Sequence, residues 1–147
     1  MIDQRNATLK EMNRGIREFG DKLLNADVGL VYYSGHGMEV KGRNYLIPVN
    51  ATLDREDEIG FETVDASLIM EKMNTAKKQI NILIIDACRD NVFSRSFRSA
   101  SRGLAQMDAP AGTYVAFSTA PGKTAQDGDG RNSPFTKNLI QYIVKTK

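Results

Sequence analysis

Apolar residues spaced three or four positions apart predict three helices along the chain. The first stripe lies within residues 7–24, and the second lies within residues 64–75, where Asp65 could cap the start of the helix. The third occupies the C-terminal segment. The stripes consist of Leu9, Met12, Ile16, Phe19 and Leu23, then Val64, Leu68, Ile69 and Met73, and finally Phe135, Leu139, Ile140 and Ile143. Each helix is therefore expected to pack one face against a common core.

Three continuous apolar runs predict buried β-strands between these helices. They span residues 26–33, 80–85 and 113–117 and are rich in β-branched and aromatic side chains. A shorter run at residues 45–49 contains a proline, which favours a small peripheral hairpin. The order helix, strand, helix, strand, loop, strand, helix predicts the α/β class. We expect a mostly parallel sheet with flanking helices, in a single domain over residues 1–147.

The composition fits a folded domain and argues against several classes of partner. The 147 residues are 41% hydrophobic and 26% charged, and the formal net charge is +2 with no dense run of Lys or Arg, so neither nucleic acid nor a membrane is expected as a partner. No apolar stretch approaches the roughly 18 residues that span a bilayer, and the N-terminus lacks the apolar core of a signal peptide, which favours a cytoplasmic location. The single Cys excludes an internal disulfide and a Cys-rich zinc site, and no cofactor or metal is expected.

The only His and the only Cys of the chain follow two of the predicted strands. His36 lies in a Ser-Gly-His-Gly segment, and Cys88 comes just after the strand over residues 80–85. Taken singly, a lone Cys is most often a small buried hydrophobe, and a His between glycines is often a turn residue. In a parallel sheet, however, both would lie at the carboxyl ends of neighbouring strands, where an imidazole can take the proton of a thiol. The pair therefore predicts a nucleophilic dyad.

Glycines flank the candidate histidine on both sides. Because Gly35 and Gly37 carry no side chains, they would let a substrate carbonyl approach backbone N–H groups closely. We assign the amides of Gly37 and Cys88 to an oxyanion hole for the tetrahedral intermediate of acyl transfer.

Two segments resemble the signatures of the caspase-like cysteine peptidases, and of bacterial metacaspase and paracaspase relatives in particular. They are Tyr-Tyr-Ser-Gly-His-Gly at residues 32–37 and Asp-Ala-Cys-Arg at residues 86–89; residues 42–48, 120–122 and 132–135 are also similar. The resemblance implies a caspase-hemoglobinase fold, a three-layer sandwich with His36 as general base and acid and Cys88 as nucleophile. It further implies that Asp86 lies in the pocket for the side chain before the scissile bond, which would favour cleavage of a peptide or protein substrate after Arg or Lys.

Compared with that family, the chain reads as a partial domain. An N-terminal core strand and a C-terminal strand of the family pattern are missing, so the sheet is expected to be incomplete at the N-terminal side. An open sheet edge beside the histidine strand would pair readily with another chain, which predicts a homo-oligomer.

The loops carry weaker signals. Asp127, in a turn-rich segment over residues 120–130, is a second candidate acid for a basic substrate side chain, and a solvated turn explains it equally well. This segment matches neither a phosphate-binding loop nor a calcium loop at the required positions. Residues 92–111 predict a flexible surface loop in which Arg95, Arg98 and Arg102 form a candidate self-cleavage site.

Two other functions remain open from the sequence. One is a catalytically inactive caspase-like domain that binds or scaffolds a partner. The other is a flavodoxin-like domain in which a loop over residues 34–37 would hold an anionic ligand.

Overall fold

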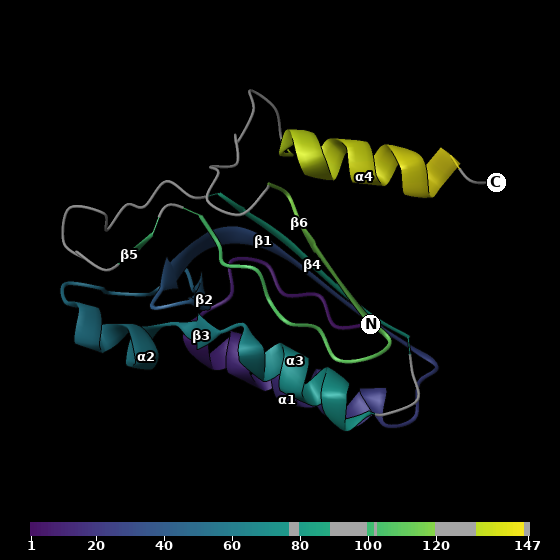
Figure 1. Ribbon diagram of the computed structural model, residues 1–147, viewed down its shortest axis with the longest axis horizontal. Coiled ribbons are helices and arrows are strands. Elements are labelled where there is room, and N and C mark those ends of the chain that lie inside the picture. Colours follow the sequence, from purple (N-terminus) through teal and green to yellow (C-terminus); the bar gives the residue numbers. More distant parts are fainter. Residues whose placement is uncertain (77–79, 89–99, 102, 120–131, 146–147) are drawn as a thin grey trace.

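The protein is a mixed β-sheet with helices on both faces. The computed structural model describes residues 1–76, 80–88, 100–101, 103–119 and 132–145. Helices α1 and α3 cover one face of the sheet, and α4 lies over the other (Figure 1). The elements are α1 (Leu9–Leu23), β1 (Val28–Val40), β2 (Arg43–Ile47), η1 (Glu56–Glu58), α2 (Ile59–Glu62), β3 (Val64–Asp65), α3 (Ser67–Thr75), β4 (Ile80–Cys88), β5 (Ala100–Ser101), β6 (Thr113–Phe117) and α4 (Pro134–Lys145). The predicted α/β class with flanking helices is confirmed.

The sheet has the strand order β3-β2-β1-β4-β6, with β5 pairing with β1. Its centre is parallel, because β4 pairs in parallel with both β1 and β6. The outer strands β2, β3 and β5 pair antiparallel. The expectation of a mostly parallel sheet therefore holds for the core and is wrong at the periphery.

Short connections explain the antiparallel periphery. Only two residues join β1 to β2, which allows a hairpin but no crossover. Lys41 and Gly42 have φ values of 53° and 79°, as the two central residues of a type I′ turn require. The turn is tied by the Gly42 N–H, which donates to Oε1 of Glu39 at 2.6 Å. The peripheral hairpin predicted from the sequence is thus present.

Local hydrogen bonds set the starts of two helices. At α1, the Thr8 side chain accepts from the N–H of Glu11, and Oε2 of Glu11 accepts from the N–H of Thr8 at 2.8 Å, which forms a capping box. At α3, the N-cap residue is Ala66, which has no side-chain cap; Asp65, predicted as the cap, lies one residue earlier, and its Oδ1 accepts from the N–H of Ser67 at 2.9 Å. Both helices are shorter than the predicted ranges by a few residues.

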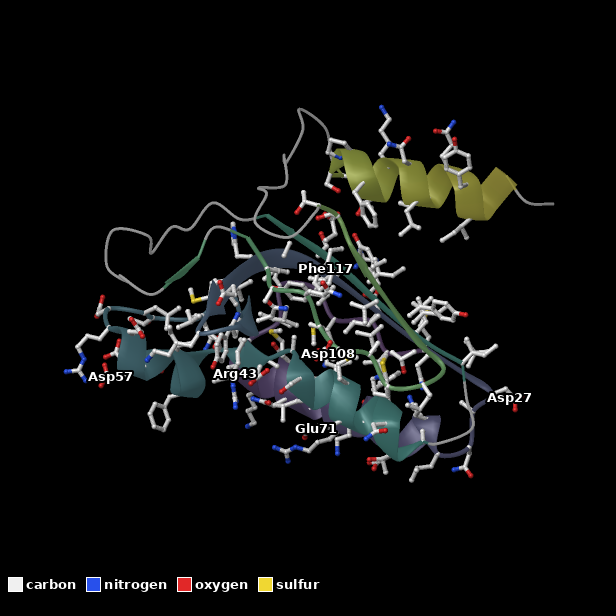
Figure 2. The ribbon with its side chains drawn as sticks, viewed as in Figure 1. Asp27, Arg43, Asp57, Glu71, Asp108 and Phe117 are labelled. Atoms are coloured by element: carbon white, nitrogen blue, oxygen red, sulfur yellow. The ribbon has the colours of Figure 1, made fainter. Side chains whose placement is uncertain are left out.

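The main core lies between the sheet and the α1–α3 pair. Its most buried side chains include Leu83 and Ile85 of β4, both 0% exposed, and Met73 of α3, 1% exposed. The apolar stripe predicted for α1 packs against this cluster. Figure 2 shows side chains crowding this layer.

Helix α4 packs less completely than its apolar stripe predicts. Phe135 and Leu139 are half-buried, but Ile140 is 48% and Ile143 is 64% exposed. Only part of the predicted apolar face is therefore covered.

Candidate active site

The backbone positions of the sole His and the sole Cys are paired across the centre of the sheet. In the parallel register of β1 and β4, His36 lies opposite Cys88, and Ser34 lies opposite Asp86. The expected neighbourhood of the two strands is thus confirmed, with β3 and α3 in the crossover between them. The side chain of Cys88 lies outside the described part of the chain.

The strand that carries His36 is longer than the sequence pattern indicates. Residues 34–37 lie inside β1 rather than in a loop after it, because residues 36–40 pair with β2. The loop that an anion-binding, flavodoxin-like reading requires at residues 34–37 is therefore absent. The His36 side chain is exposed, on the face of β1 that also exposes Tyr32 and Ser34.

A tyrosine hydroxyl holds the backbone of the strand at His36. Oη of Tyr33 donates to the carbonyl oxygen of His36 at 2.6 Å, and the carbonyl oxygen of Ile47 lies 3.3 Å from the same hydroxyl. A Cβ at Gly35 would lie 2.7 Å from this hydroxyl, so a larger residue there would displace the Tyr33 side chain. The sequence indicated no role for Tyr33, because its acceptors are backbone carbonyl oxygens of two paired strands.

Gly37 is needed for close packing between β1 and β4. A Cβ at this position would lie 3.1 Å from Cβ of Ala87 and 3.3 Å from Cδ2 of Leu104. The sequence explained this glycine by substrate approach alone, and packing supplies a second reason. The assignment of the Gly37 and Cys88 amides to an oxyanion hole stays a prediction.

Asp86 is deeply buried and bonded through only one of its oxygens. Asp86 is 1% exposed. Oδ2 accepts from Oγ1 of Thr136 at 2.5 Å and from the hydroxyl of Ser133. Oδ1 is also buried, and it has no hydrogen-bond partner among the described residues. An unpaired buried carboxylate oxygen is costly, so this atom marks a place where a donor is expected.

The donors to Asp86 come from the first turn of α4. Ser133 precedes the helix, and its hydroxyl oxygen accepts from the N–H of Thr136 at 3.0 Å, which caps the helix start. Oη of Tyr32, on β1, lies 2.5 Å from Oγ1 of Thr136. Sequence reasoning placed Tyr32 and Ser133 in family-like segments without giving either a role, and it missed Thr136. The Ser-Pro pair at a helix start was a visible capping signal, but the pairing with Asp86 had none.

Other predicted features are not placed by the structure. Asp127, the turn-rich segment over residues 120–130 and the arginines at 95, 98 and 102 lie outside the described residues. Within the described ranges, no group of three or more His, Cys, Asp or Glu side chains could hold a metal ion. Over the same ranges, no helix is long and apolar enough to cross a membrane.

A hollow of about 300 Å³ lies elsewhere, between α1, α2 and the β2–β3 pair. It is lined by Leu9, Asn13, Arg43, Tyr45, Gly60, Phe61, Thr63, Asp65 and Leu68. None of the predicted site residues contributes to it, so this hollow is separate from the His36–Cys88 region.

Comparison with known proteins agrees with this arrangement. The family model for the caspase domain of Peptidase C14 matches residues 1–147. The human mucosa-associated lymphoid tissue lymphoma translocation protein 1 is 30% identical over 79 residues, which are 54% of this chain and 9% of the human protein. Its mouse homologue gives the same identity over the same length. The match thus spans less than a tenth of these relatives.

Proposed function

The chain belongs to the caspase-domain family of peptidases, and we propose that it is a cysteine-type endopeptidase with Cys88 as nucleophile and His36 as general base and acid. The observation that carries the proposal is the strand register, in which His36 and Cys88 are direct partners. Neighbouring strands lie about 4.8 Å apart, so the two positions are close enough for side chains to meet.

The proposed reaction is acyl transfer in two steps. His36 takes the proton of the Cys88 thiol, and the thiolate attacks the carbonyl carbon of the scissile peptide bond. His36 then returns the proton to the leaving amine, which leaves the acyl group on sulfur. A water molecule, deprotonated by His36, hydrolyses this thioester and restores the thiol.

Backbone amides would stabilise the oxyanion that forms on the substrate carbonyl in each step. We assign this role to the N–H groups of Gly37 and Cys88. Gly37 directly follows His36, and Cys88 is itself the proposed nucleophile.

Asp86 is proposed to set specificity for Arg or Lys before the scissile bond. Its position in β4, opposite Ser34, is two pairs from the His36–Cys88 pair along the register. Its unpaired Oδ1 supports this role, because a basic side chain would supply the missing donor. Asp127 is retained as a second candidate acid on sequence grounds alone.

The dyad is tested by hydrolysis of peptides that differ only at the residue before the scissile bond. The wild-type chain is expected to cleave after Arg and Lys but not after Asp. Cys88→Ala and His36→Ala are each expected to abolish cleavage, with unchanged far-ultraviolet circular dichroism as the folding control. Hydrolysis that survives in Cys88→Ala would refute the assignment of the nucleophile.

Asp86→Asn tests the specificity role more sharply than Asp86→Ala does. Asn keeps an oxygen for the Ser133 and Thr136 hydroxyls, whereas Ala would release the first turn of α4. Asp86→Asn should lower kcat/KM for cleavage after Arg by a factor equivalent to roughly 2–5 kcal/mol, the cost of breaking a buried charge pair. It should raise kcat/KM for cleavage after Asp only slightly. A wild-type preference for Asp over Arg would refute the acidic pocket, and the self-cleavage site with it.

A catalytically inactive binding module is the alternative function. The observation in its favour is the burial of Asp86, which a substrate must reach. The rate of alkylation of Cys88 by iodoacetamide separates the two functions. An activated thiolate reacts faster than free cysteine at the same pH and slows in His36→Ala, whereas a structural thiol reacts slowly in both.

A further inference from the structure

A chain of hydroxyl groups converges on one oxygen of Asp86. Thr136 donates to Oδ2 from within α4, and Ser133 donates to the same atom from the residue before the helix. Tyr32 reaches Thr136 from β1. β1, β4 and α4, which are distant in the sequence, are therefore joined by one hydrogen-bond cluster around this carboxylate.

The direction of every hydrogen bond in this cluster follows from its members. A hydroxyl has one hydrogen, and Thr136 commits its own to Asp86, so Tyr32 must donate to Oγ1 of Thr136. Ser133 likewise donates to Asp86 while its oxygen accepts the N–H of Thr136. All donors are used, and Oδ2 receives two of them.

The two oxygens of Asp86 are consequently unequal. Each carboxylate oxygen offers two lone-pair sites, and both sites of Oδ2 are occupied. Oδ1 is buried with none occupied by a described residue. The N-terminal first turn of α4 also lies at this carboxylate.

We propose that Ser133 and Thr136, supported by Tyr32, are positioning residues that reserve Oδ2 and present only Oδ1 to the basic side chain of the substrate. The inference rests on the proposed function in one respect, namely that Asp86 is the acid that meets the substrate. It adds the residues that orient this acid and the geometry in which it binds a cation.

The geometry has a consequence for substrate choice. Arg normally gains over Lys by donating two parallel hydrogen bonds to both oxygens of a carboxylate. With Oδ2 saturated, a guanidinium can use only Oδ1, as an ammonium does. The pocket therefore accepts Arg and Lys with similar efficiency, although a bare carboxylate would favour Arg.

The hydrogen bonds from Ser133 and Thr136 also bear on how a substrate reaches the buried Asp86. Asp86 is 1% exposed, so a substrate cation reaches Oδ1 only when covering atoms move aside. The bonds from Ser133 and Thr136 hold the carboxylate in one orientation during that movement. This pre-organisation lowers the cost of binding.

The test compares kcat/KM for two peptides that differ only by Arg or Lys before the scissile bond. Wild type is expected to cleave both within about threefold of each other. Thr136→Val keeps the side-chain shape, frees one site on Oδ2 and should raise the Arg to Lys ratio about tenfold, the value of one further charge-assisted hydrogen bond. Thr136→Ser keeps the hydroxyl and should restore the wild-type ratio.

Matched variants separate positioning from a structural effect. Gln141→Ala, at an exposed position of α4, should leave the ratio unchanged. Tyr32→Phe removes the donor behind Thr136 without altering α4 and should raise the ratio by about twofold, so it decides the question if Thr136→Val does not fold. Equal loss for both peptides in Thr136→Val, or a wild-type ratio above about thirty, overturns the proposal.

Binding of small cations keeps this test independent of catalysis. Agmatine serves as a guanidinium probe and n-pentylamine as an ammonium probe, and both are titrated by calorimetry into wild type, Thr136→Val and Asp86→Asn. If the chain cleaves neither peptide, the proposed function fails, and the affinity ratio of the two probes takes the place of the rate ratio. If neither probe shows binding to wild type that is lost in Asp86→Asn, the positioning role is overturned as well.

Discussion

The two faces of the central strands differ sharply in how they are covered. On the face toward α1 and α3, Leu83 and Ile85 are 0% exposed. On the face toward α4, Leu30 and Ile80 are each 54% exposed, and Tyr114 is 70% exposed. The same strands thus have one closely packed side and one side on which large apolar groups meet solvent.

Coverage on the α4 face rises toward the proposed active site. Along β4, the exposed fraction falls from 54% at Ile80 to 8% at Ile84 and 1% at Asp86. The first turn of α4 lies over this end of β4 and is fastened there by hydroxyl bonds to Asp86. The comparison teaches that the α1–α3 face supplies the stability, whereas the α4 face is closed mainly where the proposed chemistry occurs.

The largest expected effect tests this division with one substitution on each face. Leu83→Ala removes a fully buried side chain and should lower the free energy of unfolding by about 2–5 kcal/mol. Leu30→Ala, its matched control on the open face, should cost less than about 1 kcal/mol. Urea unfolding followed by circular dichroism measures both. Equal losses would mean that the open face contributes as much packing as the closed one.

A smaller effect is expected from two adjacent tyrosines whose side chains lie on opposite faces of β1. Tyr33→Phe removes the hydrogen bond to the His36 carbonyl and should cost about 1 kcal/mol of stability. It should also lower kcat equally for Arg and Lys peptides, since it displaces His36 and not the pocket. Tyr32→Phe removes a part-buried hydrogen bond to Thr136 and should cost a similar amount of stability, but unlike Tyr33→Phe it should alter the Arg to Lys ratio. The comparison is contradicted if the two variants behave alike.

Much of the fold could be predicted because its signals are local. The run at residues 80–85 lies within β4, the run at residues 113–117 coincides with β6, and the predicted range of residues 7–24 contains α1. The extent of β1 could not be predicted, because residues 36–40 are held in the sheet by pairing with β2. Glycine and serine at residues 34–37 suggested a loop, and strand pairing overrode that local preference.

The residues of the candidate site also divide into those that the sequence could indicate and those that it could not. His36 and Cys88 could be selected from the sequence because each is unique and each is near a strand end, and their register agrees with that choice. The partners of Asp86 could not be selected, since Ser133 and Thr136 are 47 and 50 residues away and act through side-chain contacts alone. Periodicity reports which face a residue occupies but not which hydroxyl reaches it.

The open edge of β1 gives a third prediction. Residues 28–32 pair with β4 on one side, and no other strand of the described residues pairs with their second side. We propose that a second copy of the chain pairs there, because unpaired backbone groups beside apolar side chains favour strand addition. Light scattering should give a mass above that of one chain. Leu30→Lys should reduce this mass, whereas Leu24→Lys, an exposed position after α1, should not.

The smallest expected effect concerns the capping box of α1, on the closed face. The hydrogen bond from the backbone N–H of Thr8, and a second from its side chain, hold the pKa of Glu11 below its ordinary value of 4.5. A carboxyl whose pKa is lower in the folded state stabilises the fold above its unfolded pKa, and this contribution disappears as the pH falls through the folded value. The relevant window therefore lies below about pH 4.5.

Glu11→Gln should reduce the acid sensitivity of the closed face. Gln keeps a hydrogen-bonding group in the capping box but does not titrate, so its urea midpoint should fall less than that of wild type between pH 5 and pH 3, on the order of a few tenths of a molar. Glu71→Gln, on an exposed position of α3 outside the capping box (Figure 2), is the control and should follow the wild type. If Glu11→Gln tracks the wild type over the same range, the capping box contributes nothing to acid unfolding, and the loss of stability at low pH must arise elsewhere.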